Sequence, residues 1–326
     1  MKGLSKDSAN WLEVDDEAEG QRIDNFLLRV CKGVPKSHIY RILRSGEVRV
    51  NKGRVTPEYR LQPGDRVRVP PIRLAAKAEV EVAGAAIPLR TFDVVHEDAA
   101  LLVLDKPSGL AVHGGSGVSF GVIEQLRRMR PEARLLELAH RLDRETSGLL
   151  IVAKKRSALT RLHDAFRHGS INKRYLALVK GRWMNPRQDV KLPLLKYLTA
   201  EDERRVRVSD EGKDAHSIVR LVARWENFSL VEVELKTGRT HQIRVHLAHL
   251  GFPIAGDDKY GDFSLNKDLQ KVGLKRMFLH AAKLKLRHPL EEEAPPLVLE
   301  VPLPPELQHF LDELAQREAR DYGQAI

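Results

Sequence analysis

The order of hydrophobic and polar residues divides the chain into two parts, of which the first is short. Apolar residues recur at helical spacing in "GQRIDNFLLRVC", and "PKSHIYRILRSG" opens with proline and closes with glycine, as helices commonly do. The segment "VRVNKGRV" predicts a β-hairpin with Asn51 and Gly53 at its turn. A strand follows in "RVRVP", where arginines alternate with valines. The pattern predicts a small unit of two helices and a few strands.

From Phe92 onward strand patterns predominate. They occupy "ALLVLDK", "LELAH", "GLLIVAKK" and "KRYLALVKG", and "AHSIVRLVARWE" with "FSLVEVELKTG" forms an antiparallel pair. Helices are expected over "VIEQLRRMR", over "ALTRLHDAFRHG" with Ser157 as its cap, and over "THQIRVHLAHLG", which ends at Gly251. Strands and helices do not alternate regularly. The expected fold class is therefore α+β, with a mixed, mainly antiparallel sheet flanked by helices.

A length of 326 residues favours two domains. We expect an N-terminal tail over residues 1–19, a small first domain over 20–80, a linker over 81–91 and a larger domain over 92–326. The linker is predicted from the alanine-rich stretch that starts at Pro70 and has prolines near both ends.

Positive charge is concentrated in the first domain. The whole chain has a net charge of +10, and the segment from Gly20 to Lys77 alone holds 14 lysines and arginines against four acids. Lys36, Arg41 and Arg44 project from one side of the second helix. Such clustering indicates nucleic-acid binding, although a solvated surface is the ordinary alternative. An anionic membrane is a weaker candidate, because no apolar run is long enough to span a bilayer.

Several classes of chemistry lack their sequence signals. A single cysteine, Cys31, excludes an internal disulfide framework and a thiolate zinc cluster, and no secretory signal is visible, so we expect a cytoplasmic protein. Of three neighbouring histidines only His246 and His249 share a helix face, which does not complete a metal site. The "HGGSG" run lacks the ending of a P-loop, and no G-x-S-x-G elbow occurs. We predict neither a metal nor a cofactor.

Asp143 lies between two apolar runs in "LELAHRLDRETSGLLIVAKK" and is flanked by Arg141 and Arg144. One interpretation is a solvated turn, in which aspartate bonds to its own backbone. The other is a carboxylate held in place for chemistry. A nearby arginine favours the charged form of a carboxylate, which then acts as a nucleophile or a base.

The same motif closely resembles the signature of the RluA family of RNA pseudouridine synthases. Further segments resemble family blocks in family order, namely "LDKPSG", "AVHGG", "NKRYLALVKG", "KTGRTHQIRVHLAHLG", "DDKYGD" and "FLHAAKLKLRHP". The first domain resembles the S4 RNA-binding domain. Together these resemblances cover nearly the whole chain except the N-terminal tail, the connector and the extreme C-terminus. Within the family the chain is most similar to the C-type branch for large-subunit ribosomal RNA.

The resemblance implies a reaction and its site. The family breaks the N1–C1′ bond of uridine, turns the base and joins C5 to C1′, which consumes no water, cofactor or energy donor. Asp143 matches the catalytic aspartate, which attacks the sugar, attacks the base or assists proton removal. Arg244 matches the basic residue that the family places against this aspartate, and Tyr175 matches the tyrosine that packs on the target base.

The resemblance also implies RNA contacts. Arg141 matches an arginine that fills the space left by a flipped nucleotide. Lys106, Arg239 and His241 are lesser candidates for RNA contact or for support of the site, and Lys36, Arg41 and Arg44 are expected to bind phosphate.

The expected activity is isomerisation of specific uridines in 23S ribosomal RNA by a monomer that needs no protein partner. Three alternatives remain. One is a catalytically silent S4-containing protein that binds RNA or assists ribosome assembly. Another is a synthase for a different structured RNA such as tRNA. The third is a glycoside hydrolase, which would need a second placed carboxylate.

Overall fold

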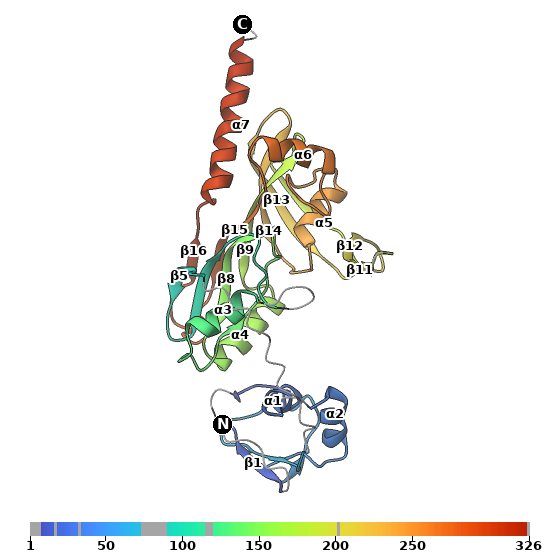
Figure 1. The fold of residues 1–326 in the computed structure, drawn as a ribbon, viewed down its shortest axis with the longest axis vertical. Coiled ribbons are helices and arrows are strands. Elements are labelled where there is room, and N and C mark those ends of the chain that lie inside the picture. The colour runs from blue at the N-terminus through green and yellow to red at the C-terminus, as the bar shows by residue number, and fades with distance from the viewer. Residues whose placement is uncertain are drawn as a thin grey trace.

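The computed structural model describes residues 8–15, 18–31, 34–72, 90–114, 120–200 and 203–324. The first of its two domains contains helices α1 (Ile23–Val30) and α2 (Lys36–Arg44) and a four-stranded sheet (Figure 1). The sheet has the order β1-β4-β2-β3, with β1 (Asn10–Glu13), β2 (Arg49–Val50), β3 (Gly53–Arg54) and β4 (Arg66–Val69). Apolar side chains of both helices and of the sheet form one core, which includes Ile23, Ile39 and Val67. The predicted helices, hairpin and strand are confirmed.

Two expectations for this domain are corrected. Residues 1–19 were predicted to be a tail, but β1 pairs antiparallel with β4, and Val14 is buried in the domain core. The hairpin turn is formed by Asn51 and Lys52, which both have positive φ, whereas Gly53 already belongs to β3. The predicted linker lies outside the described residues except for residues 90 and 91, as does most of the "HGGSG" run.

The second domain is built on a ten-stranded sheet. Eight strands follow the order β10-β13-β14-β9-β15-β8-β6-β5, while β16 pairs with β15 and β7 pairs with β8. All these pairings are antiparallel except β15 with β8, which are parallel. The predicted α+β class with a mixed, mainly antiparallel sheet is confirmed. The strands are β5 (Asp93–Glu97), β6 (Leu101–Lys106), β7 (Glu137–Leu138), β8 (Ser147–Ala153), β9 (Asn172–Lys180), β10 (Arg187–Lys191), β13 (His216–Arg224), β14 (Phe228–Leu235), β15 (Leu279–Leu286) and β16 (Leu297–Glu300).

Helices lie on and around this sheet. They are α3 (Val122–Met129), α4 (Arg156–Arg167), α5 (Gln242–His249), α6 (Phe263–Lys271) and α7 (Pro305–Gln324). Ser157 is not the cap of α4, because that helix begins one residue earlier and Lys155 occupies the N-cap position. Only the start of α7 enters the core, through Leu307 and Phe310, and its C-terminal part projects away from the sheet (Figure 1). No helix of the described residues is long and apolar enough to cross a membrane.

A separate hairpin of β11 (Leu194–Leu198) and β12 (Arg204–Val208) lies near α5 (Figure 1). This hairpin was not predicted from the sequence. Its inner face packs a small apolar cluster that contains Leu194, Val206 and Tyr260. The hairpin is thereby tied to the loop after α5.

Gly148 permits the single parallel pairing of the sheet. It has a φ of +109°, and a Cβ at this position would lie 2.3 Å from the carbonyl oxygen of Ala281 on β15. Any other residue would clash with that backbone and strain its own. The glycine of "TSGLL" therefore brings β15 against the start of β8, five residues after Asp143.

Candidate active site

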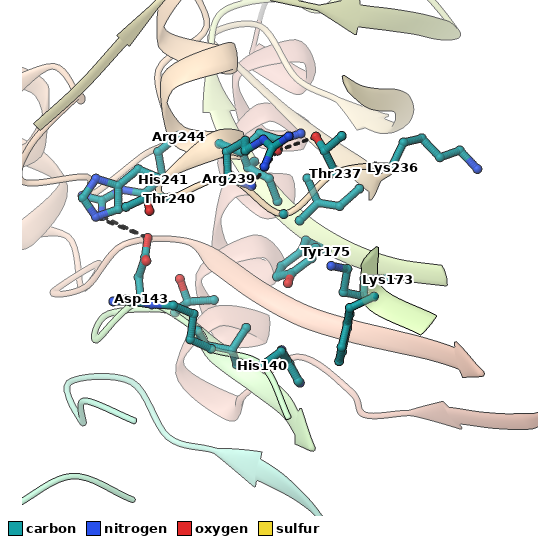
Figure 2. Close-up of a pocket in the computed structure, with 18 of the residues that line it drawn as sticks. His140, Asp143, Lys173, Tyr175, Lys236, Thr237, Arg239, Thr240, His241 and Arg244 are labelled. Carbon is teal, nitrogen blue, oxygen red and sulfur yellow. Dashed lines mark hydrogen bonds and ion pairs between the residues drawn. The ribbon is translucent and has the colours of Figure 1, made fainter. Parts of the chain in front are cut away.

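A pocket of about 550 Å³ opens where the loop before β8, strand β9 and the start of α5 meet (Figure 2). Residues that are far apart in the sequence line it together. Of the seven residues that the family resemblance assigns to this region, all except Lys106 contribute to its wall, namely Arg141, Asp143, Tyr175, Arg239, His241 and Arg244.

The loop that carries Asp143 is held from behind. Lys106 is fully buried, and its Nζ donates to the carbonyl oxygens of Pro107 at 2.7 Å, Leu110 at 2.9 Å and Arg144 at 3.1 Å. The Ser108 hydroxyl donates to the Glu145 carbonyl oxygen at 2.7 Å. Burial lowers the pKa of Lys106 to about 7. Lys106 therefore supports the loop of Asp143, which is one of the two roles expected for it, and its side chain is fully buried.

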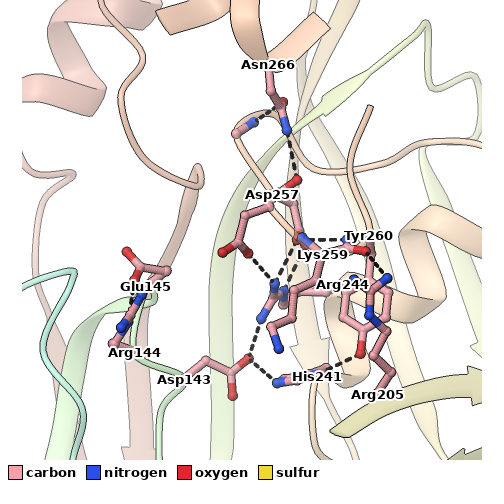
Figure 3. Close-up of polar contacts among 12 residues, drawn as sticks. Asp143, Arg144, Glu145, Arg205, His241, Arg244, Asp257, Lys259, Tyr260 and Asn266 are labelled. Carbon is pink, nitrogen blue, oxygen red and sulfur yellow. Dashed lines mark hydrogen bonds and ion pairs between the residues drawn. The ribbon is translucent and has the colours of Figure 1, made fainter. Parts of the chain in front are cut away.

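Arg244 joins Asp143 to a second carboxylate. Its Nη1 lies 3.4 Å from Asp143 Oδ2, while Nε and Nη2 donate to the two oxygens of Asp257 at 2.8 and 2.7 Å (Figure 3). The exposed fraction is 4% for the Arg244 side chain, 1% for Asp257 and 19% for Asp143. The expected contact between Arg244 and Asp143 is present. Asp257 satisfies the buried side of the guanidinium, and Asp143 meets the edge that faces the pocket.

These contacts fix the charges of the buried pair. Burial alone would raise the pKa of Asp257, but hydrogen bonds and charge from Arg244 hold that pKa below its ordinary value. Burial would likewise lower the pKa of Arg244, and Asp257 more than offsets this effect, so the pKa is raised. The guanidinium therefore stays charged at every pH at which the protein is folded, and it presents one permanent positive charge to Asp143.

His241 forms a second polar contact with Asp143. The Tyr260 hydroxyl accepts from the Val206 amide at 3.0 Å and forms a hydrogen bond of 2.8 Å with His241 Nδ1. The other ring nitrogen of His241, Nε2, faces Asp143 Oδ2 at 3.8 Å (Figure 3). Burial lowers the pKa of His241, so the ring is neutral at pH 7. His241 has a φ of +53° at the start of α5, which costs a residue with a Cβ about 1–2 kcal/mol.

Tyr175 forms the wall of the pocket beside Asp143. It is 6% exposed and projects from β9 (Figure 2). Burial and the charge of Asp143 raise the pKa of its hydroxyl, so the phenol stays protonated. Its ring offers an apolar face to whatever enters the pocket, and its hydroxyl offers a proton.

The rim of the pocket is more exposed. Arg141 and Arg239 both point toward solvent, and Arg239 Nε donates to the Asp214 carbonyl oxygen at 2.9 Å. The loop of Arg239 is held by the buried Gln242, whose Oε1 accepts from the Arg239 amide at 3.0 Å and the Thr237 hydroxyl at 2.8 Å. The rim thus exposes two arginines to solvent, and hydrogen bonds hold the loop that carries Arg239.

The remaining predicted residues lie elsewhere. Lys36, Arg41 and Arg44 are exposed on α2 in the first domain and do not line the pocket. His246 is buried and bonds to Ser217 and to the Leu192 carbonyl oxygen, so its role is structural. Within the described ranges no group of three or more histidine, cysteine, aspartate or glutamate residues is arranged to hold a metal ion.

Sequence reasoning missed three residues of this site. Asp257 and Tyr260 lie in the "DDKYGD" block, where a buried partner for Arg244 was not foreseen. Lys173 lines the pocket two residues before Tyr175. Lys173 could have been predicted to face the pocket with Tyr175, because residues two apart in a strand lie on the same face.

Comparisons with known proteins agree with this geometry. The model of the RNA pseudouridylate synthase family matches residues 100–249, and that of the S4 domain matches residues 21–67. "Ribosomal large subunit pseudouridine synthase C" of Yersinia pestis is 55% identical over 298 residues, which are 91% of this chain and 92% of that protein. The protein of the same name from Escherichia coli K12 is 53% identical over 309 residues, 94% of this chain and 95% of its own.

A solved structure is also similar. "Human RNA Pseudouridylate Synthase Domain Containing 4" has a TM-score of 0.56 and 28% identity over 68% of this chain and 93% of its own. The sequence comparisons cover both domains, and the chain belongs to the RluA family of RNA pseudouridine synthases, with an S4 domain before the catalytic domain.

Proposed function

We propose that this protein converts specific uridines of 23S ribosomal RNA to pseudouridine, with Asp143 as the catalytic carboxylate. The observation that carries the proposal is the ion pair of Asp143 with Arg244 at 3.4 Å inside a nucleotide-sized pocket. The named activity of relatives that share more than half of their residues with this chain supports the substrate.

The site provides what the isomerisation needs. A uridine turned out of its RNA helix would stack its base on Tyr175 and bring its ribose to Asp143. Arg244 fixes the position of the carboxylate, which is placed to act as a nucleophile or a base. The proton that leaves C5 is matched by one gained at N1, and the protonated Tyr175 hydroxyl lies where a proton can be exchanged.

Base flipping has a cost that the rim can offset. Unstacking and unpairing one nucleotide costs a few kcal/mol. Arg141 is exposed at the rim and suits insertion into the vacated space, where a stacked planar side chain recovers on the order of 1–3 kcal/mol. Arg239 at the same rim would bind phosphate. Lys36, Arg41 and Arg44 on the S4 domain would hold a more distant part of the RNA.

We further propose that the protein works in the cytoplasm as a monomer and needs no protein partner. The pocket supports this, because every side chain used above comes from one chain. Sedimentation of the purified protein would test it, and a dimer at micromolar concentration would contradict it.

The substrate is tested by mapping pseudouridines in RNA from cells with and without the protein. Loss of particular pseudouridines from 23S RNA, restored by the wild-type gene, is expected. Loss from transfer RNA alone would assign a different substrate, and no change in any RNA would contradict the activity.

A further inference from the structure

Lys173 is a pocket cation that the chemistry above does not use. It projects from β9 on the same face as Tyr175, and in Figure 2 Tyr175 lies between it and Asp143. Its Nζ lies 5.0 Å from the centre of the Phe166 ring and beside the backbone of Gly238. Among the described residues no carboxylate lies within ion-pair distance of this ammonium.

The other cations around the pocket are satisfied in different ways. Arg167 pairs with Asp164 at 2.9 Å, and Lys236 pairs with Glu234 at 2.5 Å. Arg244 is held by Asp257, and Arg141 is exposed to water. Lys173 has no carboxylate partner among the described residues and is not fully exposed to water, because it is half-buried against an aromatic ring. Burial lowers its pKa to about 8.

Desolvating an unpaired ammonium costs free energy that a bound anion would return. A neutral carbonyl group of a base would explain one hydrogen bond. It would not neutralise the half-buried charge of Lys173, for which the described residues supply no carboxylate. A phosphate group accounts for both features, because it carries a full negative charge and several acceptor oxygens.

We propose that Lys173 binds a phosphate of the flipped uridine and thereby fixes the nucleotide in the pocket. The inference rests on the proposed function, because it assumes that a uridine enters beside Tyr175. Lys173 would hold the phosphate end of the nucleotide while Asp143, on the other side of Tyr175, faces the ribose. Lys173 is thus a binding residue that makes the pocket bind a nucleotide more tightly than a free nucleoside.

The test compares binding of uridine, uridine 5′-monophosphate and uridine 3′-monophosphate to the full-length protein by NMR titration. The wild type is expected to bind one of the monophosphates about tenfold or more tightly than uridine, since a hydrogen bond to a charged group is worth at least one factor of ten. Lys173→Met should abolish that preference and leave uridine binding unchanged. Lys173→Arg should retain most of it.

Lys180→Met is the matched control. Lys180 lies on the same strand, is exposed, and pairs with Asp262 away from the pocket, so its loss should leave the preference intact. Three results would overturn the inference: no preference in the wild type, a preference that survives Lys173→Met, or loss of uridine binding in that variant. A Lys173-dependent preference without pseudouridine formation would instead support the phosphate site and overturn the proposed function.

Discussion

Replacing Asp257 by asparagine would test how Arg244 is held against Asp143. Asp257 accepts two hydrogen bonds from Arg244 at 2.7 and 2.8 Å, and both side chains are almost completely buried. Removing one partner of a buried pair costs about 3–5 kcal/mol. Because asparagine keeps part of the hydrogen bonding, we expect about 3 kcal/mol, which corresponds to a fall in Tm of roughly 6–12 °C for a domain of this size.

The same change should impair catalysis in protein that is still folded. Without Asp257, Arg244 can turn toward other acceptors, and its Nη1 no longer defines the position of the Asp143 carboxylate. A displacement of about 1 Å in such a site costs on the order of a hundredfold in rate. The rate should be measured as single-turnover pseudouridine formation well below the melting temperature of the variant.

Asp258→Asn is the matched control. Asp258 contacts the same Nη2 of Arg244 at 3.2 Å, but its side chain is 64% exposed. Its loss should cost less than about 1 kcal/mol and leave the rate nearly unchanged. If the two variants behaved alike, the buried carboxylate would not be what orients Arg244, and the reasoning would fail.

The effect of Asp257 should also depend on pH. Its pKa in the folded protein lies below the ordinary value of 3.8, so its contribution to stability is present above that pH and is lost as the pH falls through the lowered pKa. The difference in unfolding free energy between wild type and Asp257→Asn should therefore be constant near neutrality and shrink in acid. A difference that grew in acid would contradict this sign.

Three further variants test other parts of the structure. Tyr260→Phe removes the hydroxyl that bonds to His241, and single-turnover kinetics should show a loss of about tenfold in rate with little change in RNA affinity; an unchanged rate would show that this contact does not orient the site. Gly148→Ala places a methyl group against the Ala281 carbonyl and should cost more than about 2 kcal/mol in denaturant unfolding, whereas a stable variant would contradict the close approach. Neutralising Arg44 should lower the slope of log affinity for RNA against log salt by about 0.7–0.9, and an identical slope would mean that this residue faces water in the complex.

The candidate catalytic residues could be predicted from the sequence more fully than the residues that hold them in place. Asp143, Tyr175 and Arg244 lie in contiguous motifs, so the family resemblance assigned them, and the structure brings all three to one pocket. Asp257 was missed because its role depends on a contact with Arg244 that only the tertiary fold makes. The sequence left two roles open for Lys106, because its burial among backbone carbonyls depends on loops that only the tertiary fold brings together.

The local sequence pattern did not predict strands that form by pairing with distant segments of the chain. β1 was taken for part of a polar tail, since only four residues form it and it becomes a strand by pairing with β4 more than fifty residues later. The hairpin of β11 and β12 carries many charges, which hide its alternation. Its inner side is recognisable only when Val206 is seen to pack with Tyr260. Helix α5 was recognised because its end at Gly251 is a local signal.

The account depends most directly on the carboxylate of Asp143. RNA labelled with tritium at uracil C5 should release the label when incubated with the wild-type protein, since C5 exchanges its hydrogen for a bond to C1′. Asp143→Asn should release none above background while binding the same RNA with nearly wild-type affinity. Continued release of tritium by that variant would contradict the central claim.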